Sequence, residues 1–340
     1  MTEPDWTEPG AYPVAAGVHR IPLPLPMDGL RAVNVYALET DSGLTLIDGG
    51  WAIEDARRLL EAGLKEMGYG LGDITRFLVT HVHRDHYTQA VTIRREYGAH
   101  VSLGLGDKPT LDLILDHPDQ DPTVDRLRRA GAPGLAESWA RHLRVRPDPE
   151  QWEYPDAWLA DDHPVQVGRR TLDAVSTPGH TQGHFVFVDA AAGLLFAGDH
   201  VLPSITPSIG VESASAAQPL GDFLSSLAKV RALPDLRLLP AHGPVTGSTH
   251  ARIDELLAHH EERLALCRQA VESGSGTAYD VAKQLPWTRR ARSLSELDLF
   301  NAALATLETH LHLELLAAQG RLARTDDGEA VGYAPVGADR

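Results

Sequence analysis

The chain has 340 residues and a mass of 36.9 kDa, which is long enough for one large domain with an appendage or for two domains. Its hydrophobic content of 43% is sufficient for a full core, and its single cysteine, Cys267, excludes an intramolecular disulfide and a cysteine-rich zinc knuckle. The formal net charge of −16 argues against general binding to nucleic acid or to anionic lipid.

The first segment, residues 1–16, is acidic and rich in proline, and we expect it to form an extended leader. It has neither the basic start nor the apolar core of an export signal. Nowhere does an apolar run approach the roughly 20 residues that span a bilayer, so no membrane association is expected. Together with the single cysteine, these features predict a cytoplasmic protein.

The next part of the chain alternates between strand-like and helix-like patterns. Runs of β-branched and apolar residues between turn formers predict strands at 18–25, 32–38, 44–47 and 74–80, and a short strand near Val101. Apolar residues spaced three and four apart predict helices at 52–67 and 85–97. Because the polar cluster after residue 80 follows a strand, we expect it at the carboxyl edge of a sheet, where sites form in α/β folds.

The second part repeats this logic after an irregular helical stretch, which we interpret as an insertion at about 105–150. Strands are predicted at 165–167, 172–176, 185–188, 194–197 and 236–239, and a helix at 220–233. Two similar β-rich halves with helices outside predict an α/β fold, a four-layer αβ/βα sandwich over residues 17–248.

The remaining residues, 249–340, are mainly helical. Helices are expected at 249–272, 278–284 and 294–318, followed by a polar hairpin-like tail, which together predict a small winged-helix-like domain. We expect this region to support a homodimer. Four histidines lie on these predicted helices, where exposed or packing roles are expected: His259, His260, His310 and His312.

The sharpest local feature is the segment His81-Val82-His83-Arg84-Asp85-His86. A chance match to His-x-His-x-Asp-His is expected in fewer than about one in a hundred such chains. Imidazoles two residues apart in an extended or turning segment can converge on one metal ion, and the following Asp85 and His86 are free to reach a second. This pattern therefore predicts a metal site.

Three further candidates follow predicted strands downstream, namely His180, Asp199 and His242. Each is flanked by glycine or proline, as expected where backbone packs closely around a compact cluster. A ligand set of imidazoles and carboxylates without thiolate favours Zn²⁺, with Mn²⁺ or Fe²⁺ as alternatives.

As an ordered set, these motifs resemble those of metallo-β-lactamase-fold hydrolases, particularly the glyoxalase II-like branch. The resemblance extends from Asn34-Val35-Tyr36 and the strand ending in Asp48-Gly49-Gly50 to His242, and so covers most of the chain. One departure is Tyr87-Thr88-Gln89, where relatives usually have two small glycines; we expect it to alter the pocket wall or the approach of the helix.

The resemblance assigns a role to each candidate. It implies a first metal bound by His81, His83 and His180, a second bound by Asp85, His86 and His242, and Asp199 as the bridging carboxylate. Asp48 and His184 are expected to support the ligands from behind. Two ions about 3.5 to 4 Å apart would share a water and lower its pKa from about 15.7 to about 7, so that a bridging hydroxide attacks a carbonyl. Asp85 would orient that nucleophile and carry its proton.

The function implied is hydrolysis of a small-molecule carbonyl ester, thioester or lactone. A phosphodiesterase or ribonuclease is an alternative because of the winged-helix-like tail, although the acidic balance argues against it. A β-lactamase, an iron-dependent oxygenase and a non-enzymatic binding module built on the same fold are further alternatives. The sequence does not name the substrate, because loops and the insertion set specificity.

Overall fold

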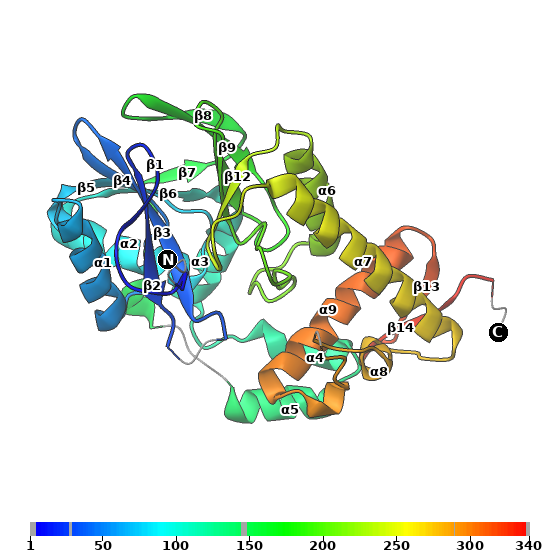
Figure 1. Cartoon of the computed structure of the whole chain (residues 1–340). Helices are drawn as coiled ribbons and strands as arrows, with labels where there is room; N and C mark the ends of the chain where they lie inside the picture. The colour runs from blue at the N-terminus through cyan, green and yellow to red at the C-terminus, as the bar shows by residue number, and fades with distance from the viewer. Residues whose placement is uncertain (1–4, 27–28, 144–147, 289, 338–340) are drawn as a thin grey trace.

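We describe the protein from a computed structural model, which defines residues 5–26, 29–143, 148–288 and 290–337. Two β-sheets lie face to face, and helices cover the outer face of each sheet (Figure 1). The predicted α/β class and four-layer αβ/βα sandwich are therefore confirmed. The parts of the predicted leader, insertion and tail at residues 1–4, 144–147 and 338–340 lie outside the described residues.

The N-terminal half builds the first sheet, in which the strands follow one another in chain order. They are β1 Tyr12–Ala15, β2 Val18–Pro24, β3 Ala32–Thr40, β4 Gly43–Ile47, β5 Ile74–Leu78, β6 His100–Gly104 and β7 Ala157–Leu159. Helix α1, Glu54–Glu66, joins β4 to β5, and helix α2, Arg84–Tyr97, joins β5 to β6; both pairs of strands are parallel. Strand β1 lies in the segment predicted as a leader and pairs with β2 at the edge of the sheet.

The second sheet has the strand order β12-β11-β10-β9-β8. Its strands are β8 His163–Val167, β9 Arg170–Ser176, β10 Phe185–Asp189, β11 Leu194–Gly198 and β12 Arg237–Pro240. Neighbours from β8 to β11 are antiparallel, whereas β11 and β12 are parallel because helix α6, Pro219–Arg231, joins them as a crossover.

Side-chain alternation along the strands produces the four layers. In β10, Phe185 and Phe187 face the first sheet, whereas Val186 and Val188 face the core beneath α6. All four are buried, as expected for a strand covered on both faces. The core between the sheets includes Leu38 and Leu78 from the first sheet and Phe196 and Leu239 from the second.

The insertion contains three helices, α3 Lys108–Asp116, α4 Pro122–Arg129 and α5 Pro133–His142. Leu127, Ala136 and Trp139 of this insertion pack against Ala303 and Leu307 of the C-terminal helices. Figure 1 shows α4 and α5 beside α9, away from the two sheets. The insertion is therefore held in place by the C-terminal region and not only by its own ends.

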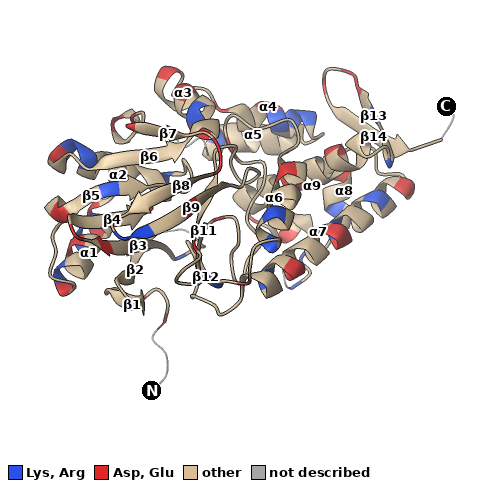
Figure 2. Cartoon of the chain, turned by 90° about the horizontal axis from the view of Figure 1, so that it is seen from above, with Lys and Arg blue, Asp and Glu red and all other residues tan. Residues whose placement is uncertain are grey.

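The C-terminal region contains α7 Thr249–Glu272, α8 Ala278–Gln284 and α9 Leu299–Ala318, followed by a hairpin of β13 Leu322–Asp326 and β14 Val331–Pro335. The predicted succession of helices and a hairpin is observed; the domain boundaries and the winged-helix description stay predictions. Among the described residues, no helix has both the length and the apolar character needed to cross a bilayer. Figure 2 shows the charged residues mostly on the outer helices and loops, with the strands largely free of them.

Candidate metal centre

The predicted site residues lie at the carboxyl ends of strands from both sheets. His81 and His83 follow β5, while Asp85 and His86 lie in the first turn of α2. The other three follow β9, β11 and β12, and they are His180, Asp199 and His242. Strands that end at the same edge hold these loops rigidly, so residues more than 150 positions apart in sequence meet there.

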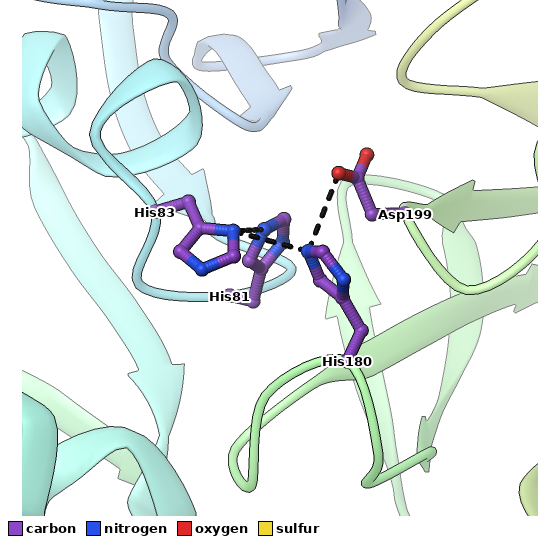
Figure 3. Close-up of side chains that lie close together, drawn as sticks. All are labelled: His81, His83, His180 and Asp199. Carbon is purple, nitrogen blue, oxygen red and sulfur yellow. Dashed lines mark hydrogen bonds and ion pairs between the residues drawn. The ribbon is translucent and has the colours of Figure 1, made fainter. Parts of the chain in front are cut away.

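A first cluster joins three imidazoles to one carboxylate (Figure 3). Nδ1 of His83 lies 2.9 Å from Nε2 of His81 and 3.0 Å from Nε2 of His180. Nε2 of His180 lies 3.4 Å from Oδ2 of Asp199. Three ring nitrogens this close cannot all carry protons, so the arrangement is suited to share a cation.

A second cluster lies on the other side of Asp199 and contains Asp85, His86 and His242. Oδ2 of Asp85 lies 3.7 Å from Nε2 of His86 and 3.5 Å from Nε2 of His242. Oδ1 of Asp199 lies 3.6 Å and 3.3 Å from the same two nitrogens. Asp199 therefore directs one oxygen to each cluster, and the structure brings together all seven predicted ligands.

The hydrogen bonds of the histidine rings fit metal ions. Nδ1 of His86 donates to Asp48 at 2.8 Å, and Nδ1 of His242 donates to the Ala32 carbonyl at 2.8 Å. In contrast, Nε2 of both rings and Oδ1 of Asp199 are buried without a hydrogen-bond partner among the described residues. A neutral ring that donates through Nδ1 presents a free lone pair at Nε2, as metal-binding histidines do. The donor set thus fits the expected cations.

The electrostatics of the site point the same way. Burial alone would lower the pKa of His86, but the carboxylates of Asp48, Asp85 and Asp199 outweigh it and raise that pKa to about 10. By contrast, burial and the neighbouring His180 lower the pKa of His83 to about 3. The side of the site around His86 therefore favours positive charge, whether as protons or as metal cations, whereas His83 stays neutral and keeps a lone pair free for a metal ion.

Asp48 lies behind the ligand loop, where support was predicted. Its Oδ1 accepts from the Thr80 backbone N–H at 2.7 Å, and its Oδ2 accepts from His86. Its φ of 64° is a left-handed conformation that aspartate tolerates better than most residues. The next residue, Gly49, has no room for a side chain, because a Cβ there would lie 2.7 Å from the Ala90 backbone nitrogen. This packing brings α2 close to the end of β4.

His184 belongs to neither cluster. Its Nδ1 lies 2.8 Å from the Thr177 hydroxyl, and its Nε2 accepts from the Asp199 backbone N–H at 3.2 Å. A Cβ on Gly198 would lie 2.7 Å from this nitrogen, so glycine is needed for the close approach. His184 therefore orients the loop that carries Asp199, a placement that agrees with the predicted supporting role.

The unusual Tyr87-Thr88-Gln89 segment is buried in α2. The Tyr87 hydroxyl donates to the Glu153 carbonyl at 2.6 Å, and the Thr88 hydroxyl accepts from the Ala52 N–H at 2.9 Å. Both contacts hold α2 against neighbouring loops. Of the two expected effects, a changed pocket wall or a changed approach of the helix, these contacts bear on the approach of the helix.

The sequence reasoning missed Asp107, which links the loop of His81 and His83 to the loop of His180. Its Oδ2 accepts from the Val82 N–H and its Oδ1 from the Gly183 N–H, both at 2.8 Å. Burial raises the pKa of this carboxyl to about 6, although Thr181, Gly183 and Val82 lower it by hydrogen bonding. A signal was present, because Gly106-Asp107 comes shortly after the end of strand β6, much as Gly198-Asp199 stands at the end of β11.

Glu212, also missed, ties the insertion to the second half. Its Oε1 accepts from the Thr110 hydroxyl and its Oε2 from the Gln182 N–H, both at 3.0 Å. Arg126 donates to the backbone carbonyls of Gly210 and Glu212. Burial, followed by the charge of Asp107, raises the pKa of Glu212 to about 8. No local sequence motif marks this residue.

Comparison with known proteins agrees with this geometry. A family model described as the Metallo-beta-lactamase superfamily matches residues 28–242. The probable metallo-hydrolase YqjP of Bacillus subtilis (strain 168) is 25% identical over 338 residues, which cover 92% of this chain and 95% of that protein. The atrochrysone carboxyl ACP thioesterase nsrC of Aspergillus novofumigatus is 26% identical over 251 residues, or 73% of this chain and 61% of that protein.

A solved structure extends the similarity to nearly the whole chain. The beta-lactamase domain protein from Burkholderia ambifaria superimposes with a TM-score of 0.76 and 28% sequence identity. The match covers 96% of this chain and 93% of that one, so it includes the C-terminal helices as well as the sandwich.

Proposed function

The chain belongs to the metallo-beta-lactamase superfamily, and from this premise we propose that it is a dinuclear metal-dependent hydrolase of a small carbonyl ester, thioester or lactone. The position of Asp199 carries the proposal. Its two oxygens face two separate groups of ligands, an arrangement suited to a carboxylate that bridges a pair of cations.

The proposed ligand sets follow the two clusters. His81, His83 and His180 would hold one ion, Asp85, His86 and His242 would hold the other, and Asp199 would contact both. Imidazole and carboxylate donors suit Zn²⁺, with Mn²⁺ and Fe²⁺ as alternatives. The described residues offer no cysteine thiolate to these ions, because the single cysteine, Cys267, lies on α7 and is buried in the core that α7 shares with α6.

The protein's own groups define what the site can do. When bound, a pair of divalent cations supplies Lewis acidity that brings the pKa of a water to about 7. Burial tends to raise the pKa of Asp85, but His86 and His242 outweigh it and lower that pKa, so Asp85 is a carboxylate at neutral pH. Its side chain is 15% exposed, so it can take a proton from the attacking water and release it to solvent.

The substrate class is argued from relatives and charge. A relative named as an acyl carrier protein thioesterase supports a thioester among the carbonyl substrates. The formal net charge of −16 disfavours a polyanionic substrate such as RNA, and this argues against a ribonuclease despite the C-terminal helices and hairpin.

The proposal is tested by metal analysis and a substrate panel. Purified protein is expected to carry zinc or a related transition metal and to hydrolyse at least one member of a panel of acyl thioesters, esters and lactones. His83→Ala removes the nitrogen nearest to both His81 and His180 and is expected to abolish turnover.

A matched control is His100→Ala, because His100 is exposed and lies at the opposite end of β6 from the site. This variant should retain full activity. Metal-free protein, or activity restricted to phosphodiesters and RNA, would contradict the proposal.

A further inference from the structure

A further cluster of histidines and a carboxylate lies between α7 and α9, away from the catalytic edge, the edge of the two sheets that carries the seven proposed ligands. It contains His259 and His260 from α7 and Glu308 from α9, each offering one ligand atom within 4.8 Å of the others. The same separation holds within the two clusters around Asp199. Helices α7 and α9 pack against each other along this stretch (Figure 1).

The hydrogen bonds of His260 fix its tautomer. Nδ1 of His312 lies 2.8 Å from the Glu308 carbonyl, which can only accept, so His312 donates there and its Nε2 is an acceptor. Nδ1 of His260 lies 3.2 Å from that Nε2 and therefore donates to it. In the neutral ring this leaves a lone pair on Nε2 of His260.

That nitrogen has no partner. His260 is fully buried, and its Nε2 makes no hydrogen bond within the described part of the chain. His86 and His242 show the same combination of a donating Nδ1 and a buried, unpartnered Nε2. Buried polar atoms without partners are rare, and at the catalytic edge they mark the atoms that face the proposed cations.

The carboxylate in the cluster is also unengaged. In the described ranges, no hydrogen bond or ion pair reaches the carboxyl oxygens of Glu308. The neighbouring cation, Arg263, donates instead to the Pro286 carbonyl at 3.0 Å and lies over the Trp287 ring at 4.2 Å. His259 is partly exposed, which gives an ion a route from solvent.

We propose that His259, His260 and Glu308 bind a third transition-metal cation, separate from the catalytic pair. Zn²⁺ is the cation that this ligand set suits best. Two imidazoles and one carboxylate are a common zinc ligand set, and a water at the exposed side completes four-coordination. Ligands of a tetrahedral zinc site lie about 3.4 Å apart, so the donor atoms close in slightly on binding. The Phe223 ring lies between this site and the catalytic region, 5.6 Å from His260 and 5.3 Å from His200.

The consequence is a cross-link between α7 and α9. Because α9 also carries Ala303 and Leu307, which hold the insertion, an ion at this site stabilises the packing of the insertion on the C-terminal helices and not the reaction itself. The third site does not depend on the proposed hydrolytic function, since it shares no ligand with it.

The test is the zinc content of the full chain, measured by mass spectrometry after equilibration with Zn²⁺ and removal of free metal. We expect about three ions in the unchanged protein and about two in His259→Ala and Glu308→Gln. The matched control His310→Ala changes a histidine on the same helix that bonds to Tyr333, and it should keep three.

Two further readouts make the result decisive. Zn²⁺ should raise the melting temperature of His83→Ala, whose catalytic cluster is broken, and should raise it less when His259→Ala is added. If Glu308→Gln fails to fold, His259→Ala, a change at a partly exposed helix position, still gives the answer. Equal zinc content in the unchanged protein and in His259→Ala would overturn the third site. A lower zinc content in His83→Ala reports on the catalytic pair only, so the two proposals can fail separately.

Discussion

The two halves of the sandwich supply their candidate ligands in different ways. The N-terminal half supplies four from the single segment 81–86, whereas the C-terminal half supplies one from each loop after β9, β11 and β12. A shared segment needs shared supports, and Asp48 and Asp107 provide them. Damage to one support in the first half is therefore expected to move several ligands, while damage in the second half moves one.

Asp199 is the exception that should give the largest effect, because it is one residue of the second half that faces both clusters. Asp199→Ala is expected to lower kcat/KM by far more than the about 10–100-fold typical of residues that support ligands from behind. Bound metal at the catalytic edge should fall from both positions, as measured by zinc content. His184→Gln, which disturbs the contacts of His184 with Thr177 and with the Asp199 backbone but leaves the Asp199 carboxylate in place, is the graded comparison; equal effects of the two variants would contradict the bridging role.

Asp107 should give the next largest effect, because it holds one loop from each half. Asp107→Asn replaces one of two acceptor oxygens with a donor that faces a backbone N–H, which costs about 1–3 kcal/mol in the free energy of unfolding. We also expect activity to fall about 10–100-fold as both loops shift. Urea unfolding and steady-state kinetics measure the two effects. Asp116→Asn on the exposed end of α3 is the control and should change neither.

Asp48 supports only the first half, and its effect should be largest at the cluster that contains His86, the ligand it contacts directly. Asparagine tolerates the left-handed backbone at this position, so Asp48→Asn removes the charge behind His86 without straining the chain. Zinc affinity at the cluster of Asp85, His86 and His242 is expected to weaken about 10–100-fold, and affinity at the other cluster is expected to weaken less. Competition with a chelator measures both affinities, and equal weakening of the two would argue against separate clusters.

Glu212 lies in the second half and should affect stability far more than activity. Its pKa is raised to about 8, so between pH 4.5 and 8 the folded chain holds a proton that the unfolded chain releases. The free energy of unfolding is thus largest at low pH, and it falls as pH rises through this window by at most about 1.4 kcal/mol per pH unit. Glu212→Gln should flatten this slope in urea titrations at several pH values. An unchanged slope would show that Glu212 titrates normally.

The same contrast explains how much could be predicted from the sequence. The segment 81–86 is a local motif after a strand, and His180, Asp199 and His242 each stand beside glycine or proline, so local patterns were sufficient to predict the seven residues that the structure brings together. The strand and helix positions also followed from periodicity, because buried strands such as β10 and amphipathic helices such as α1 keep their patterns.

Residues that act through long-range backbone contacts were harder to find. Asp107 accepts from N–H groups that are 25 and 76 positions away, and Glu212 accepts from one that is 30 positions away. Such partners depend on how the insertion folds back onto the sheets. His260 was expected to be exposed or packed, and it is buried; the partners that make it notable, His312 and Glu308, lie on another helix about 50 residues away. Only the packing of α7 on α9 brings them together.

The most direct test is a crystal structure of the zinc-loaded protein with anomalous data collected at the zinc edge. The account predicts two peaks about 3.5–4 Å apart at the catalytic edge, with one oxygen of Asp199 on each. A single peak there, or peaks that leave Asp199 uncoordinated, would contradict it.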